Sequence, residues 1–380
     1  MWKKQESCVN LMKNKNIPLA KPLIGSKEKR AVQRVLNSGN LAQGPVVAAF
    51  EKNFSRFVSD RDCVAVNSGT SGLVTAVMSL GIGQGDEVIV PSFTFAASAN
   101  SIALSGAKPV FIDIDPDYYS LSEQLLEAAI NSKTKAIMPV HLHGLMCDMR
   151  QIKKISKKFN LKIIEDASQA HGSKYYKTSP GFYSDIATFS FYPTKNLGAI
   201  GEGGAVITNK KSIFRKIAAL RTWAENKNSF FDIGYNYRMT DIQGAIGVVQ
   251  LAKLDKFIDE RDQWAQYYKE QLKDIPWLRT PETPNGYKHG WQSYVTYIDE
   301  SCAPMKRNDI MEFLQQRGIS TRPGTHAVHM LDVYAKMYSI KPQDFPNAFN
   351  ADQYSMSIPM HNKMSSEDFE YIVHILKSIK

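Results

Sequence analysis

A lysine that could act as a nucleophile follows an apolar stretch of the chain at residues 186–190. The stretch ends in a polar turn, and Lys195 lies just past it. Ligands of α/β proteins bind at the carboxyl ends of parallel strands, and a lysine amine held there can condense with a carbonyl group to form a Schiff base. Read alone, Lys195 is equally compatible with a solvated loop lysine, which is the commoner case.

A carboxylate follows a second apolar stretch, at residues 162–165. Asp166 comes directly after it and is followed by small residues. A carboxylate beside a pyridine nitrogen keeps that nitrogen protonated, so that a pyridoxal phosphate (PLP) ring can accept electrons from a substrate carbanion. Because Asp166 and Lys195 both follow predicted strands, their side chains could reach one crevice. By itself, Asp166 could instead be the N-cap of a helix.

A candidate phosphate cradle lies at residues 67–72, after another predicted strand and at the start of a predicted helix. Gly69 permits close approach of the backbone, and Thr70 and Ser71 offer hydroxyl groups. The amino end of a helix carries partial positive charge and free N–H groups, which together bind phosphate; a simple N-cap is the alternative. Phe93, at the end of a further predicted strand, could stack on a flat ring or pack in the core.

The elements that must position these residues alternate between apolar strands and helices over residues 60–210. This alternation predicts an α/β fold, with a mostly parallel sheet covered by helices on both faces. A long amphipathic helix is expected over residues 241–272, followed by a polar linker and an α+β region. The predicted division is an N-terminal arm (1–24), a large cofactor-binding domain (25–255) and a small C-terminal α+β domain (256–380).

Composition narrows the classes of partner. The four cysteines are far apart and include no CxxC pair, so neither a disulfide framework nor a metal site is expected. The net charge of +10 is carried by dispersed lysines, without a recognised nucleic-acid module, so no nucleic-acid partner is expected. The charge fits a solvated basic surface or attraction of a diphosphate substrate. No segment reads as a signal peptide or a membrane span, and we expect a cytoplasmic protein.

Taken together, in this order and at these spacings, the motifs resemble those of the DegT/DnrJ/EryC1/StrS sugar aminotransferases. This family is a branch of the fold type I PLP enzymes, which are related to aspartate aminotransferase. The likeness covers nearly the whole chain, and the block from Ser190 to Lys195 with the Gly-Glu-Gly-Gly after it is the most specific part. Further matching blocks lie at residues 17–19, 38–44, 85–91, 234–239 and 357–360.

The resemblance implies a role for each matched residue. Lys195 would form the internal aldimine with PLP and move protons, and Asp166 would pair with the pyridine nitrogen. An asparagine equivalent to Asn236 reaches the phosphate of the neighbouring subunit's cofactor in such enzymes, which implies a homodimer with shared active sites; a local turn is the alternative. The other implied cofactor contacts are Gly69, Thr70 and Ser190 at the phosphate, Phe93 over the ring and Gln169 near the phenolic oxygen.

The resemblance also implies the reaction. L-Glutamate would donate the amino group in a ping-pong cycle, and a nucleotide-linked keto sugar would accept it. We expect a 4-keto-6-deoxy hexose on GDP, dTDP or UDP, with a 3-keto sugar as the alternative, in deoxyamino sugar and lipopolysaccharide O-antigen biosynthesis. Family members with histidine in place of the lysine perform dehydration, so the presence of Lys195 favours amino transfer.

The residues that would bind the substrates are less well defined by the motifs. Arg238 and Arg322 are candidates for the cation that binds the donor carboxylate. The segment 323–330 departs from the commonest family pattern, and His326 and His329 in it could contact the sugar or simply start a helix. Two other functions remain open: a non-catalytic PLP-binding regulatory protein, and a lyase that acts on a free amino acid.

Overall fold

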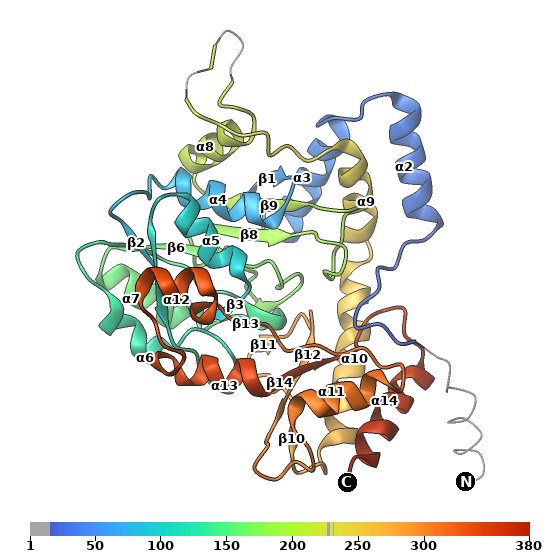
Figure 1. Cartoon of the computed structure of the whole chain (residues 1–380). Coiled ribbons are helices and arrows are strands. Elements are labelled where there is room, and N and C mark those ends of the chain that lie inside the picture. The colour runs from blue at the N-terminus through green and yellow to red at the C-terminus, as the bar shows by residue number, and fades with distance from the viewer. Residues whose placement is uncertain (1–15, 226–228, 231) are drawn as a thin grey trace.

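A seven-stranded sheet forms the centre of the computed structural model, which describes residues 16–225, 229–230 and 232–380 (Figure 1). The strand order is β1-β9-β8-β6-β5-β2-β4. Four neighbouring pairs are parallel, and only the pairs with β9 are antiparallel. The mostly parallel sheet predicted from the sequence is therefore confirmed. The strands are β1 (Asp62–Val66), β2 (Glu87–Pro91), β4 (Lys108–Ile112), β5 (Thr134–Ile137), β6 (Lys162–Asp166), β8 (Ile186–Ser190) and β9 (Gly204–Thr208).

Helices cover both faces of this sheet because its strands are apolar on both sides. In β1, Val64 packs in one buried cluster and Ala65 in another, as expected when successive side chains point to opposite faces. The first cluster is completed by α4 (Gly69–Ser79), α5 (Ala96–Leu104) and α8 (Lys211–Arg221). The opposite face is covered by α3 (Pro45–Phe57), α7 (Met149–Lys158) and the start of α10 (Leu254–Leu272).

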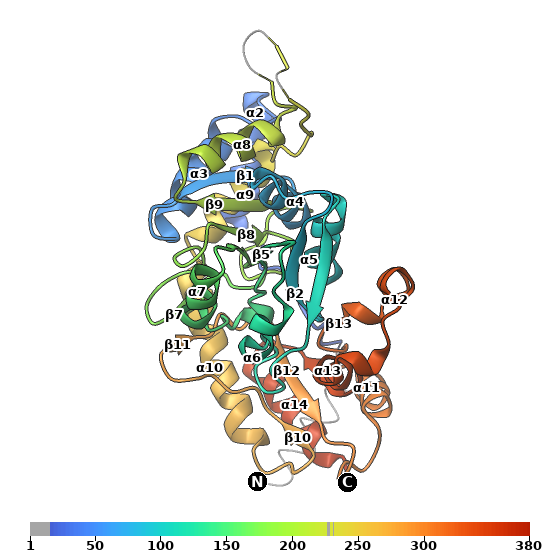
Figure 2. The ribbon, with the colours of Figure 1, turned by 90° about the vertical axis from the view of Figure 1, so that its left-hand side faces the viewer.

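The predicted helix over residues 241–272 is two helices, which corrects the single long helix. α9 (Asp241–Leu251) packs on α3 and on α2 (Ser26–Ser38), whereas α10 runs from the sheet towards the C-terminal elements (Figure 2). The chain breaks at residues 252–253, where the amide of Lys253 bonds to Gln250 instead of continuing the α-helical pattern. The break separates α9, which packs on α2 and α3, from α10, which packs on the C-terminal residues.

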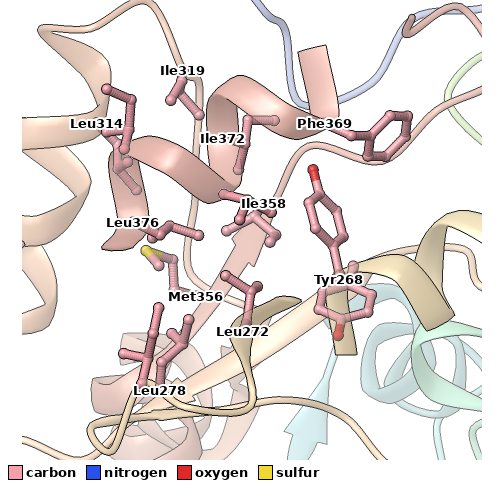
Figure 3. Close-up of a cluster of buried hydrophobic side chains, with 14 of the residues drawn as sticks. Tyr268, Leu272, Leu278, Leu314, Ile319, Met356, Ile358, Phe369, Ile372 and Leu376 are labelled. Carbon is pink, nitrogen blue, oxygen red and sulfur yellow. The ribbon is translucent and has the colours of Figure 1, made fainter. Parts of the chain in front are cut away.

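The C-terminal residues build a second core around a three-stranded sheet with the order β10-β12-β14. Figure 3 shows Tyr268 of α10, Leu314, Ile358 and Phe369 converging there from four different elements. The division into domains near residue 256 stays a prediction, since this boundary falls inside α10. The elements of this region are β10 (Leu278–Arg279), β12 (Tyr294–Ile298), α11 (Arg307–Gln315), α12 (Asp332–Tyr338), α13 (Pro346–Tyr354), β14 (Ser355–Ile358) and α14 (Ser366–Ser378).

Short elements connect the two cores. The predicted arm is described only from residue 16, and there Ile17 bridges to Ile319 in the C-terminal region. No helix in the described ranges is both long and apolar enough to cross a membrane. The short strands are β3 (Phe93–Thr94), which pairs with β13 (His326–Ala327), and β7 (Lys174–Tyr175), which pairs with β11 (Tyr287–Lys288).

Candidate active site

A cleft of about 510 Å³ lies at the carboxyl ends of β1, β6 and β8 and gathers most of the predicted site residues. A larger hollow of about 740 Å³ lies at the opposite ends of the strands, near Asp86 and Lys162, and none of the predicted residues line it. The chemistry therefore belongs to the smaller cleft. The predicted residues that line it are Gly69, Thr70, Asp166, Gln169, Ser190, Lys195, Arg322 and His326.

Lys195 sits in the turn after β8, where its amide donates to the carbonyl of Tyr192 at 2.8 Å. Burial lowers the pKa of its amine to about 8, because the surrounding protein disfavours the charged form. The carboxylate of Asp166 opposes this shift, and the charge of Arg322 adds to it. Near neutral pH the amine is therefore close to the point at which it can both accept and release a proton.

Asp166 is the last residue of β6, and both of its carboxylate oxygens have partners. Oδ2 accepts a hydrogen bond from the hydroxyl of Ser98 at 2.7 Å, and Oδ1 accepts one from the amide of Ser168 at 3.1 Å. The hydroxyl of Ser98 also lies 3.1 Å from that of Thr94. No helix starts after Asp166, so the N-cap alternative is wrong. The two bonds hold the carboxylate of Asp166 in one orientation within the cleft.

The predicted phosphate cradle is the first turn of α4. Its N-cap is Ser68, whose hydroxyl accepts from the amide of Ser71, and the first amide to bond back within the helix is that of Gly72. The amides of Gly69 and Thr70 precede that bond, so the helix offers them no carbonyl. A Cβ on Gly69 would lie 2.7 Å from the Cβ of Ser190, so only glycine lets the turn close onto the end of β8. These groups fit a phosphate.

The assignment of Phe93 to the ring face is corrected by the structure. Phe93 is fully buried and packs against Tyr119, with ring centroids 5.6 Å apart. Phe95 lines the cleft and is 57% exposed. β3 pairs with β13 through Phe93 and Thr94, and the chain then turns into α5, so that Phe95 is the aromatic residue directed into the cleft.

Gln169 faces the cleft with one end of its amide already engaged. Its Oε1 accepts a hydrogen bond from the backbone amide of His143 at 2.8 Å. This bond leaves the Nε2 group as the donor available to a ligand. The orientation suits an acceptor such as a phenolic oxygen.

Besides Phe93, three predicted residues lie outside this cleft. Arg238 places its guanidinium 4.2 Å from the ring centroid of Trp223, and Asn236 is exposed in the same region. His329 is fully buried, with Nε2 3.1 Å from the carbonyl of Pro342, so its proposed contact with the sugar is corrected. His326 is exposed at the cleft, beside Phe95.

Sequence reasoning missed three residues that the fold brings to the site: Phe95, Ser98 and Gln292. Phe95 could have been found by allowing both aromatic residues of the 91–95 motif. Ser98 and Gln292 carried no local signal, because they lie in segments far along the chain from Asp166 and Lys195.

Comparisons with known proteins agree with this geometry. The model of the DegT/DnrJ/EryC1/StrS aminotransferase family matches residues 22–377. The chain is 36% identical to the spore coat polysaccharide biosynthesis protein SpsC of Bacillus subtilis, over 97% of this chain and 98% of that protein. It is 34% identical to GDP-perosamine synthase of Caulobacter vibrioides, over 96% and 98% of the two chains. The crystal structure of S. venezuelae DesV in complex with a ketimine intermediate superposes with a TM-score of 0.91 at 31% identity, covering 96% of this chain and 98% of DesV.

The charge balance around Lys195 gives a first prediction. Asp166→Asn removes the charge that favours the ammonium, so we expect a lower pKa for Lys195; Arg322→Gln removes a like charge, so we expect a higher one. The pKa can be measured in the cofactor-free chain from the pH dependence of labelling by an amine-reactive reagent, read on the peptide that carries Lys195. Arg317→Gln, whose guanidinium bonds to the carbonyl of Phe313, is the control. Shifts of the opposite sign would contradict the prediction.

Proposed function

The chain belongs to the DegT/DnrJ/EryC1/StrS aminotransferase family of PLP-dependent sugar aminotransferases, and from this premise we propose that it transfers an amino group from L-glutamate to a nucleotide-linked keto sugar through Lys195. One observation carries the proposal. The amine of Lys195 and the carboxylate of Asp166 line the same cleft as the open amino end of α4.

These groups fit PLP by their chemistry. The first turn of α4 offers free amides and the hydroxyls of Thr70 and Ser190 to a phosphate. Asp166, kept as an acceptor by Ser98 and Ser168, is suited to a protonated ring nitrogen. When bound, PLP supplies the electron sink for a carbanion on the substrate.

The residues of the cleft then have distinct tasks. Lys195 would hold the cofactor through its amine, and the same amine would carry a proton between reacting atoms, for which a pKa of about 8 is well placed. Gln169 Nε2 would be the donor for the ring's phenolic oxygen. Phe95, which lines the cleft in place of Phe93, would cover the ring face and keep water from it.

We assign the donor carboxylate to Arg322 rather than Arg238. Arg322 lines the cleft and lies within electrostatic reach of Lys195. Burial lowers its pKa, and no carboxylate among the described residues opposes that shift, although Arg322 keeps exposed surface in the open cleft. Burial also lowers the pKa values of Arg61, Arg261 and Arg307. At each of these three, unlike at Arg322, a nearby carboxylate acts in the opposite direction and raises the pKa again. Arg322 therefore has a charge left to offer an anionic ligand.

For the acceptor we propose a 4-keto-6-deoxy hexose linked to a nucleoside diphosphate, with a 3-keto sugar as the alternative. The likeness to GDP-perosamine synthase supports a GDP-linked sugar, and the likeness to SpsC supports a place in the synthesis of a surface polysaccharide, such as an O-antigen. Phe95, Tyr192 and His326 surround the cleft and offer flat faces and a polar edge to a sugar or a base.

We propose that the functional unit is a homodimer. Phe230 and Ile233 are 68% and 78% exposed beside Asn236. Large apolar side chains that stand out in this way fit a surface that a second copy covers. Asn236 would then reach the phosphate of the partner's cofactor, which explains why it lies outside its own subunit's cleft.

Removing the amine tests the central assignment. In Lys195→Ala we expect the absorption band of the imine between PLP and the lysine to be lost and the transamination rate to fall at least about 10³-fold, since both the covalent link and the proton carrier are lost. The wild-type chain should bleach when L-glutamate is added. Lys336→Ala, on the exposed surface of α12, is the control. Unchanged absorption and turnover in Lys195→Ala would refute the proposal, and a wild type that no amino donor bleaches would favour a regulatory protein.

The donor site has its own test in the first half-reaction. We expect Arg322→Gln to raise the glutamate concentration needed for half-maximal bleaching about 10- to 100-fold, because a charged hydrogen bond to the carboxylate is lost. Arg322→Lys keeps the positive charge but lacks the planar guanidinium group. Its glutamate concentration for half-maximal bleaching should therefore lie between those of the wild type and Arg322→Gln. The second half-reaction, followed with the amino form of the cofactor and a keto sugar, should change little. A loss confined to that second half-reaction would assign Arg322 to the sugar nucleotide instead.

The acceptor can be identified with the glutamate-reduced enzyme. We expect return of the visible absorption with a GDP-linked 4-keto-6-deoxy hexose, and slower return with the dTDP and UDP forms, because contacts with the base add binding energy only where they match. Mass spectrometry of the product checks the carbon that carries the amine. Reaction with 3-keto sugars alone would overturn the choice of carbon, and release of product from an amino acid without any keto sugar would indicate a lyase.

A further inference from the structure

The side chain of Gln292 forms a bracket around Lys195, that is, one hydrogen bond to the peptide unit on each side of this residue. Gln292 Oε1 accepts a hydrogen bond from the amide of Asn196 at 3.1 Å, and Gln292 Nε2 donates to the carbonyl of Thr194 at 3.0 Å. These two groups belong to the peptide units on either side of Lys195. The side chain of Asn196 adds a third bond, from Nδ2 to the carbonyl of Gly290 at 2.5 Å. The turn that carries Lys195 is thus held from outside the central sheet.

The segment that carries Gln292 is itself tightly fixed. Trp291 has a φ of 49°, in the left-handed region that residues other than glycine seldom adopt. Its surroundings must therefore hold the backbone in this conformation. Its ring stacks on that of His289 with centroids 3.8 Å apart, and its indole N–H donates to Asp262 at 2.8 Å. Its carbonyl accepts from the buried guanidinium of Arg261 at 2.9 Å. The backbone from which Gln292 projects is therefore held by contacts on several sides.

The same segment is linked to the residue assigned to the ring's phenolic oxygen. The amide of Gln292 donates to the carbonyl of His143 at 2.9 Å, and the amide of His143 donates to Gln169 Oε1 at 2.8 Å. A Cβ on Gly144 would lie 2.8 Å from the amide nitrogen of Trp291, so glycine is needed for the two segments to approach. Hydrogen bonds through Gln292 and His143 thus connect the backbone on either side of Lys195 to Gln169.

We propose that Gln292 is a positioning residue that fixes the direction of Lys195 relative to Gln169 and Asp166, an inference that rests on the proposed function. The bracket needs an acceptor and a donor at one side-chain end, which a carboxamide provides. An ionised carboxylate would place an acceptor against the carbonyl of Thr194, and an aliphatic side chain would satisfy neither group. Gln292 acts through the lysine, so it controls the reaction rate more than the affinity for the donor.

The bracket can be measured without any catalysis. In the full chain, with and without PLP, we expect Gln292→Leu to speed hydrogen exchange of the Asn196 amide roughly tenfold, because its acceptor is lost. Gln316→Leu is a matched control, since Gln316 lies on the exposed surface at the end of α11 and its side chain donates to Glu312 of the same helix. Equal protection of Asn196 in the wild type and Gln292→Leu would overturn the inference, whatever the activity.

Kinetics then separate positioning from a structural role. In Gln292→Leu, per mole of bound cofactor, we expect the saturating rate of the glutamate half-reaction to fall roughly 10²-fold, as misplaced reacting groups do, with little change in the half-saturating concentration. A normal rate constant with reduced cofactor content would mean a structural role and overturn the inference. If the wild type failed to react with glutamate, the proposed function would fail while hydrogen exchange still decided the bracket.

A carboxylate variant adds a pH signature. In Gln292→Glu the protonated carboxyl both donates and accepts, so we expect the deficit in its reaction rate relative to the wild type to shrink as the pH falls towards the pKa of the introduced carboxyl. A purely electrostatic effect gives the opposite trend, because a new negative charge raises the pKa of Lys195 and depletes the free amine first at low pH. A deficit that grows at low pH would therefore contradict the bracket.

Discussion

The parallel pairing of β6 with β8 is the constraint on which the site depends. Asp166 pairs with Thr188, so the carboxylate at the end of β6 emerges beside the end of β8, where the chain leads to Lys195. β1 is antiparallel to β9, which is antiparallel to β8, so β1 also ends at this edge and delivers the amino end of α4. Three groups that are remote in sequence meet there because parallel strands end together.

Burial gives these groups their chemistry. The amine of Lys195 has a lowered pKa mainly because the fold removes water around it, and the charges of Asp166 and Arg322 act in opposite senses on it. Asp166 tolerates the same surroundings because Ser98 and Ser168 donate to both of its oxygens. The lowered pKa of Lys195 and the fixed orientation of the Asp166 carboxylate thus both follow from the same buried environment.

The far wall of the cleft comes from the C-terminal half of the chain. Residues 322–326 reach it because β13 pairs with β3, and the amide of Ala327 donates to Asp352 Oδ1 at 2.9 Å. Gln292 reaches the lysine turn from the segment that leads into β12. Neither contact belongs to the central sheet, so the packing of the second core controls how the chemical groups face one another.

The local sequence predicts those features of this protein that depend on interactions between residues close together in the chain. The strand-and-helix alternation, the lysine and the carboxylate after apolar stretches and the glycine-rich helix start could all be read directly, because each depends on neighbours within about one turn or strand. Tertiary structure alone decided which of Phe93 and Phe95 faces the cleft, since the answer lies in the pairing of β3 with residues 326–327. It also decided that His329 is buried and that Gln292 bonds to the backbone of Thr194 and Asn196 on either side of Lys195. Such contacts join residues tens to hundreds of positions apart, and nothing in the spacing along the chain records them.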